Sequence, residues 1–99
     1  VNIIMGRMGL QYDNASAVAV GKRHKNVYLE TSSSMDFNTL RAMKTAGIDQ
    51  VLLGTGTPDA GYYELELVKV RKAAANFPEG EEKVLWKNAA RIFGLEEGC

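Results

Sequence analysis

The chain has 99 residues, the length of one ordinary domain, and 45% of them are hydrophobic, which is enough to bury a core. Twelve Lys and Arg balance twelve Asp and Glu, so the charge excess that draws a domain to nucleic acid or to an anionic membrane is lacking. Cys99 is the only cysteine, which excludes a disulfide framework within one chain and is typical of a reducing, cytoplasmic compartment.

Three short apolar runs recur at even spacing along the chain. They are Ile3-Ile4-Met5, Val27-Tyr28-Leu29 and Val51-Leu52-Leu53. Each run is apolar throughout rather than alternating, as a strand buried on both faces requires. The runs therefore predict three parallel strands. None of them approaches the roughly 18 apolar residues of a membrane span, so we expect no membrane association.

Segments of helix length follow each run, and each carries boundary residues that start or stop helices. The expected helices are one over 15–23 capped by Asp13 or Asn14, one capped by Asp36 and followed by Gly47, one that starts near Tyr62 and is stopped by Pro78, and one over about 81–93 followed by Gly94. Helical spacing then predicts which residues face the core. They are Ala15, Val18, Ala19 and Lys22 in the first helix, Phe37, Leu40 and Met43 in the second, Tyr63, Leu67, Val70, Ala74 and Phe77 in the third, and Leu85, Ala89 and Ile92 in the last.

The alternation of strand and helix predicts one α/β domain over 1–99, with three parallel strands and a closing C-terminal helix. Each strand-helix unit has the length of one unit of a (β/α)₈ barrel, so the chain corresponds to part of such a barrel. A small doubly wound sheet is the alternative.

A partial barrel would leave two strand edges and one sheet face uncovered. The residues expected on that face are Ile3, Met5, Val27 or Tyr28, and Leu52 or Leu53. Exposed apolar surface of this kind marks association. We therefore expect the sheet to be completed by self-association into a homo-oligomer or by missing barrel segments.

Ligands of parallel α/β folds bind at the carboxyl ends of the strands, which here are the loops 6–9, 31–34 and 54–58. The candidate ligand-binding residues in these loops are Arg7, Ser32, Thr55 and Thr57. A cation, hydroxyls and backbone amides suit a small anionic ligand such as a carboxylate or phosphate. Ser, Thr and Gly are also the residues that tight turns and helix caps need, so a purely structural role is the alternative.

Other kinds of site are not supported by the motifs. The Gly54–Gly61 loop lacks the Lys of a P-loop and the third Gly of a dinucleotide fingerprint. His24 is the only histidine and is expected at a helix end away from the strand loops. One imidazole cannot provide a zinc site or activate Ser32 to Ser34 as nucleophiles.

Three segments in order resemble the last three units of the amidohydrolase-related (β/α)₈ family of metal-dependent hydrolases and decarboxylases. Residues 26–32 (NVYLETS) resemble its seventh strand, 50–58 (QVLLGTGTP) its eighth, and 84–94 (VLWKNAARIFG) its final helix. The resemblance implies a barrel scaffold and a site for a divalent metal such as zinc when the whole family site is present.

Two positions depart from the family pattern. The sixth strand usually ends with a catalytic histidine, where this chain has Arg7, and the eighth with a metal-binding aspartate, where it has Gly56. Arginine cannot act as a general base near neutral pH, and glycine offers no metal ligand.

Two functional hypotheses follow. In the first, the chain is a non-catalytic, self-associating relative of the barrel that binds a small anion and needs no cofactor. In the second, it is the C-terminal part of a metal-dependent hydrolase or decarboxylase that acts on a small carboxylate-bearing substrate.

Overall fold

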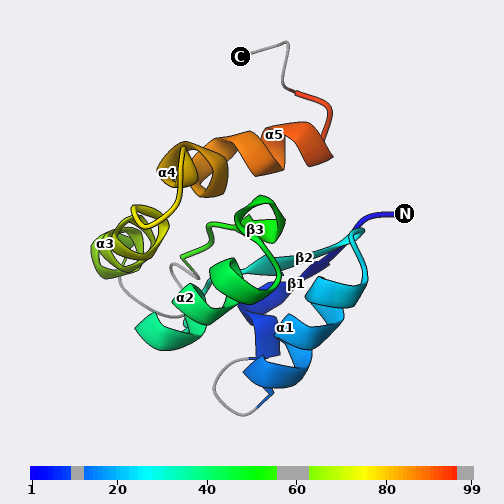
Figure 1. The fold of residues 1–99 in the computed structure, drawn as a ribbon. Coiled ribbons are helices and arrows are strands. Elements are labelled where there is room, and N and C mark those ends of the chain that lie inside the picture. Colours follow the sequence, from blue (N-terminus) through cyan, green and yellow to red (C-terminus); the bar gives the residue numbers. More distant parts are fainter. Residues whose placement is uncertain (10–12, 56–62, 96–99) are drawn as a thin grey trace.

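The computed structural model describes residues 1–9, 13–55 and 63–95 and shows a mixed α/β fold (Figure 1). Its elements are β1 (Ile3–Met5), the 3₁₀ turn η1 (Gly6–Gly9), α1 (Asn14–Arg23), β2 (Val27–Glu30), α2 (Asp36–Thr45), the 3₁₀ turn η2 (Ile48–Gln50), β3 (Val51–Leu52), α3 (Tyr63–Ala74), α4 (Gly80–Glu82), the π-turn η3 (Lys83–Lys87) and α5 (Asn88–Ile92). The three predicted strands are confirmed.

The strands are parallel and stand in the order β1-β2-β3. Ile3 lies opposite Val27, and Leu29 lies opposite Val51. The order does not reverse, and α1 and α2 lie on the same side of the sheet (Figure 1). The described sheet therefore lacks the switch point that defines a doubly wound fold.

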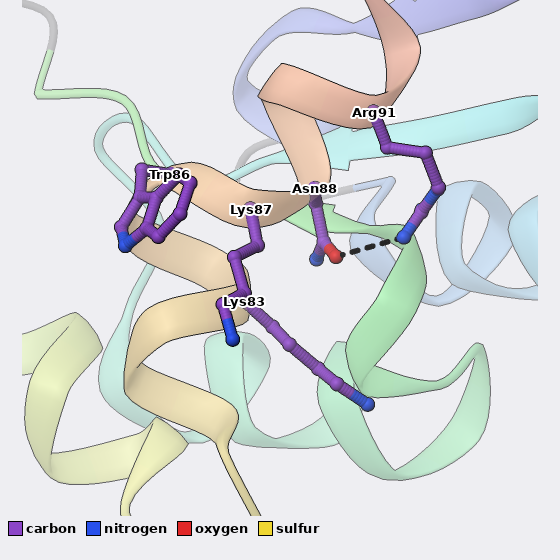
Figure 2. A pocket seen from close by; sticks show the side chains of 5 residues that line it. All are labelled: Lys83, Trp86, Lys87, Asn88 and Arg91. Atoms are coloured by element: carbon purple, nitrogen blue, oxygen red, sulfur yellow. Dashed lines mark hydrogen bonds between the residues drawn. The ribbon is translucent and has the colours of Figure 1, made fainter. Parts of the chain in front are cut away.

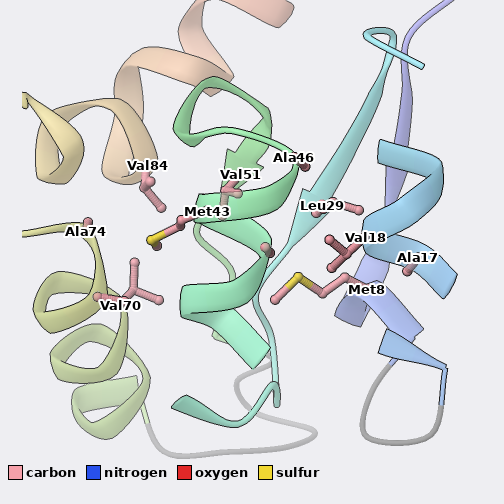
Figure 3. Close-up of a cluster of buried hydrophobic side chains, with 12 residues drawn as sticks. Met8, Ala17, Val18, Leu29, Met43, Ala46, Val51, Val70, Ala74 and Val84 are labelled. Atoms are coloured by element: carbon pink, nitrogen blue, oxygen red, sulfur yellow. The ribbon is translucent and has the colours of Figure 1, made fainter. Parts of the chain in front are cut away.

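The core lies between one face of the sheet and the helices (Figure 3). Leu29 and Val51 are fully buried and contribute the sheet side. The helices contribute Ala17, Val18, Ala42, Met43, Val70, Ala73, Ala74 and Val84, together with Met8 and Ala46 from adjoining turns. Helix α1 approaches the sheet closely at Gly21, where a Cβ would lie 3.2 Å from Leu29. Small residues here permit the short distance between helix and strand.

The C-terminal helical segment, α4 to α5, covers the outer edge of β3. The Asn88 side-chain amide donates to the carbonyls of Ile48 at 2.8 Å and Val51 at 2.9 Å. The Leu53 amide donates to the Val84 carbonyl at 3.1 Å. Val84 lies in the π-turn η3, and a π-turn releases a carbonyl from the helical ladder. The expectation of two open edges is therefore wrong for β3.

The uncovered apolar surface of the sheet is confined to β1. Ile3 and Ile4 are 50% and 40% exposed, whereas Val27, Tyr28 and Leu52 are buried. The prediction that the second and third strands would also present apolar side chains to solvent is therefore wrong. The described part of the chain places no strand beside the outer edge of β1.

The helix ranges agree with the prediction to within a few residues, although Asp36 is the first residue of α2 rather than its N-cap, and α3 ends at Ala74, before the predicted stop at Pro78. Two of the buried helix faces are rotated. In α1, Val18 is buried as predicted, whereas Ala15, Ala19 and Lys22 are exposed. The buried face of α1 instead uses Asn14, Ala17 and Gly21.

The buried face of the C-terminal segment also differs from the predicted one. Val84, Asn88 and Ala90 are buried, and the predicted Leu85, Ala89 and Ile92 are half-buried. The π-turn adds a residue to one turn and so rotates the face that follows it.

The other two helices follow the predicted stripes more closely. Met43, Val70 and Ala74 are buried, and the stripes fail at the first turns, where Phe37 and Tyr63 are exposed. Tyr62 lies outside the described residues. No helix in the described ranges is both long and apolar enough to span a membrane.

Candidate functional site

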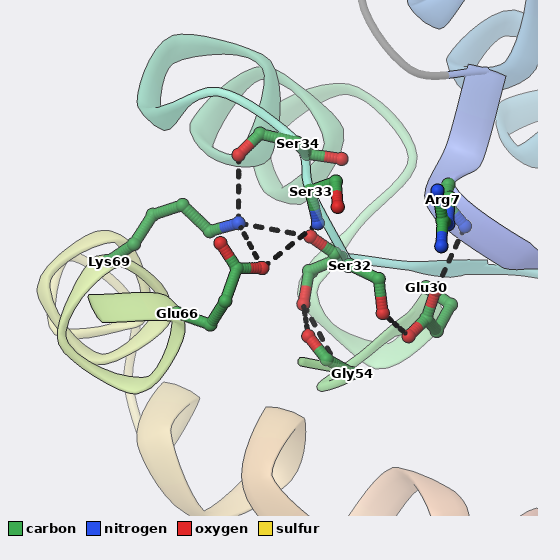
Figure 4. Close-up of polar contacts among 9 residues, drawn as sticks. Arg7, Glu30, Ser32, Ser33, Ser34, Gly54, Glu66 and Lys69 are labelled. Carbon is green, nitrogen blue, oxygen red and sulfur yellow. Dashed lines mark hydrogen bonds and ion pairs between the residues drawn. The ribbon is translucent and has the colours of Figure 1, made fainter. Parts of the chain in front are cut away.

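Glu30, the last residue of β2, is the centre of the carboxyl edge of the sheet (Figure 4). Its carboxylate accepts a hydrogen bond from the Arg7 backbone amide at 2.8 Å and another, short one from the Ser32 hydroxyl. The side chain is half-buried. Two elements far apart in sequence thus hold one carboxylate in a defined position.

The turn after β1 aims the Arg7 amide at Glu30 through an unusual backbone. Arg7, Met8 and Gly9 have φ values of 60°, 31° and 80°, three successive residues in the left-handed region. For the two non-glycine residues this costs about 1–3 kcal/mol each. Packing holds the turn in place, because the Met8 side chain is fully buried and its carbonyl accepts a hydrogen bond from the Asn14 side chain at 3.0 Å. Strained backbone of this kind often occurs at functional sites.

Gly54, just after β3, lies directly against this carboxylate. A Cβ at Gly54 would be 1.2 Å from Glu30 Oε2 and 2.6 Å from Ser32 Oγ. The Gly54 backbone is held by Thr31, whose hydroxyl accepts from the Gly54 amide at 3.2 Å and donates to its carbonyl at 3.4 Å. The Glu30 carboxylate therefore needs glycine at this position.

The loop between β2 and α2 is fixed by an ion pair on α3. The Lys69 ammonium donates to Glu66 at 2.9 Å, to the Thr31 carbonyl at 3.0 Å and to the Ser34 carbonyl at 2.8 Å. Glu66 also accepts from the Ser33 amide at 2.9 Å. Both charged side chains are largely buried and well supplied with hydrogen bonds. We interpret this pair as a support for the loop that carries Ser32.

The structure brings together two of the four predicted ligand-binding residues. Arg7 and Ser32 both contact Glu30, and Thr55 directly follows Gly54 in the same edge of the sheet. Thr57 and Gly56, the position of the family's metal-binding aspartate, lie outside the described residues. That Arg7, Ser32, Thr55 and Thr57 bind a ligand remains a prediction.

Glu30 itself was missed by sequence reasoning. The available signal was one carboxylate at the end of an otherwise apolar strand, where the next residues are polar. A residue in this position indicates only where the strand ends. Only the fold shows that the amide of Arg7 and the Cα of Gly54 converge on it.

The Arg7 guanidinium takes part in none of the ion pairs formed by the described residues. Arg7 contacts Glu30 through its backbone amide, not through its charge. The Arg7 guanidinium and the Glu30 carboxylate therefore lie at neighbouring strand ends and form no ion pair with each other.

Within the described ranges, no group of three or more His, Cys, Asp and Glu side chains converges as a metal site would require. His24 is exposed and follows the last turn of α1, ahead of β2. It therefore lies at the opposite end of the sheet from Glu30, as the sequence predicts.

A separate pocket of about 370 Å³ lies on the C-terminal helical segment (Figure 2). It is lined by Lys83, Trp86, Lys87, Asn88 and Arg91. Three of these are cations spaced by four residues, a stripe that sequence reasoning did not single out.

The cations of this pocket are held by neighbouring groups. Lys83 pairs with Asp49 at 3.1 Å, and Arg91 donates to the Asp49 carbonyl at 2.8 Å. Lys87 pairs with Glu82 at 2.8 Å and with Glu79 at 3.5 Å. The hydrogen bond to Glu82 is the main reason that the pKa of Lys87 is raised above its ordinary value. Because Asp49 precedes β3, this pocket lies at the amino end of the sheet, away from Glu30.

Comparison with known proteins adds no relative to this description. The sequence matches no family model, and no curated protein matches it.

Proposed function

We propose that this chain binds a small anionic ligand, a carboxylate or a phosphate, at the carboxyl edge of its sheet, without catalysing a reaction itself. The observation that carries the proposal is that Arg7 has a fixed backbone and a guanidinium outside the ion pairs of the described residues. Its backbone is held by Glu30 and by the buried Met8, while its guanidinium forms no ion pair with the described residues. A planar, permanently charged group on a fixed base is suited to bidentate binding of an anion.

Several neighbouring groups support this location. Ser32 and Thr55 lie at the ends of the adjacent strands, and ligands of parallel α/β folds bind at this edge. The non-catalytic part of the proposal rests on Arg7 as well. It occupies the position that resembles the catalytic histidine of the amidohydrolase-related family, and a guanidinium cannot accept a proton near neutral pH.

The test is titration calorimetry with acetate and with inorganic phosphate. We expect Arg7→Ala to weaken binding by roughly tenfold or more, since a hydrogen bond to a charged group contributes about 1.5–3 kcal/mol. The melting temperature should change little, because the guanidinium makes no described ion pair. Arg23→Ala, at the exposed end of α1, is the matched control. Equal affinity in wild type and Arg7→Ala would remove Arg7 from the site.

Metal analysis distinguishes this proposal from the alternative. Stoichiometric zinc or manganese in carefully purified protein would support the C-terminal part of a metal-dependent hydrolase or decarboxylase instead. The double variant Arg7→His, Gly56→Asp is expected to remain inactive, because the family's remaining ligands belong to units that this sequence does not contain. Metal-dependent turnover by that variant would contradict the proposal.

We also propose that the chain associates with a second copy through β1. Ile3 and Ile4 are exposed on the two faces of this strand. The opposite edge of the sheet is covered by Asn88 and by the Val84 carbonyl. A sheet with one open edge pairs once, which favours a two-fold dimer over a larger ring. The missing segments of a larger barrel are the alternative partner for the same edge.

A further inference from the structure

We infer that the ligand of the carboxyl edge is a small zwitterion, with a carboxylate for Arg7 and an ammonium group for Glu30. The inference rests on the proposed function, because it takes Arg7 as the anion-binding residue. It adds a second charged contact, and with it a ligand class, the amino acids.

The first step concerns the charge on Glu30. Both groups that donate to its carboxylate, the Arg7 amide and the Ser32 hydroxyl, are neutral. Neutral donors fix the position of the carboxylate but do not neutralise it. Each carboxylate oxygen can accept about two hydrogen bonds, so each retains capacity for a further donor.

The second step concerns the nearest cations. Lys69, the cation of the adjoining loop, is engaged by Glu66 and two carbonyls. The Arg7 guanidinium stands on the neighbouring strand end and is not within ion-pair distance of Glu30. Glu30 thus has no ion-pair partner in the described part of the chain, although it is half-buried.

The third step concerns how the Glu30 carboxylate and the base of the Arg7 side chain are placed. The Glu30 carboxylate is held from two sides by hydrogen bonds and lies against the Gly54 backbone. The Arg7 backbone is held in the left-handed turn. A ligand with one charge would satisfy one group and meet repulsion from the other. A ligand with both charges satisfies each group at once.

The experiment is titration calorimetry with matched pairs of small molecules. Glycine, β-alanine and γ-aminobutyrate are compared with acetate, propionate and butyrate, which differ from them only in the ammonium group. Because the spacing of the two charges increases along the first series, one member should fit best. We expect that member to bind at least tenfold more tightly than its matched carboxylate.

Two variants test the role of Glu30. Glu30→Gln keeps the shape and an acceptor oxygen but removes the charge, and Gly54→Ala displaces the carboxylate without neutralising it. Both should lose the preference for the amino acid over the carboxylate. Glu64→Gln, an exposed change on α3, should retain it.

The outcomes separate this inference from the proposed function. If carboxylates and amino acids bind equally to the wild type, or if Glu30→Gln and Gly54→Ala keep the preference, the zwitterion is wrong. In that case the loss of carboxylate binding in Arg7→Ala would still support the anion site. If no compound of either series and no phosphate binds, both proposals fail.

Discussion

At the scale of single residues, Gly54 is the position where the site depends most on the absence of a side chain. The Glu30 carboxylate occupies the space that a side chain at position 54 would need. Its Oε2 atom lies 1.2 Å from the ideal position of a Cβ there. We expect Gly54→Ala to reduce the free energy of unfolding by about 1–3 kcal/mol, because it displaces the Glu30 carboxylate and breaks the hydrogen bonds from the Arg7 amide and the Ser32 hydroxyl, each worth about 0.5–1.5 kcal/mol. Urea unfolding measures this. Gly6→Ala is the control, since a Cβ there meets nothing within 4 Å; an equal loss in both variants would contradict the close contact.

Thr39 is a second residue whose environment makes a prediction. It is fully buried in α2, and its hydroxyl has no hydrogen-bond partner around it in the described structure. A buried hydroxyl without a partner costs about 1–3 kcal/mol. Thr39→Val should therefore raise the urea midpoint, while Thr45→Val at the exposed end of the same helix should change it little. A lower midpoint for Thr39→Val would mean that the hydroxyl is satisfied in solution.

At the scale of elements, Asn88 connects the C-terminal helical segment to β3. Its amide satisfies two backbone carbonyls, and the residue is fully buried. Asn88→Ala leaves both carbonyls unpaired in the interior, so we expect a loss of about 2–5 kcal/mol. Hydrogen exchange should show the segment 80–93 opening before the strands. Asn76→Ala is the control, because Asn76 is exposed and its side chain donates to the carbonyls of Lys72 and Ala73 in the last turn of α3. Uniform exchange across the chain would argue against a separable segment.

At the scale of the whole molecule, the open edge of β1 decides how the chain completes its sheet. Ile4→Lys places a charge on this edge, the device by which natural edge strands avoid pairing. Light scattering coupled to size exclusion should show a dimer for the wild type and a monomer for Ile4→Lys. Val68→Lys on the exposed face of α3 should remain dimeric. A wild-type monomer at all concentrations would instead direct attention to missing barrel segments as the partner of β1.

The sequence by itself determined the three strands, their parallel direction and the approximate helix ranges. Continuous apolar runs and helix boundary residues such as Gly47, which has a φ of 109°, depend on local physical chemistry and survive in any tertiary context. The sequence also predicted that Arg7 and Ser32 lie at the carboxyl ends of the strands, where side chains of parallel folds meet, and both contact Glu30 there.

Only the tertiary structure decided which edge is open and where the negative charge of the site lies. The covering of β3 depends on a π-turn carbonyl at Val84 meeting the Leu53 amide, and no local pattern encodes that distance. Glu30 becomes the centre of the site because a strained turn at Arg7 and the bare backbone of Gly54 approach it from other strands. Contacts between residues far apart in sequence arise from packing, so they are visible only once the chain is folded.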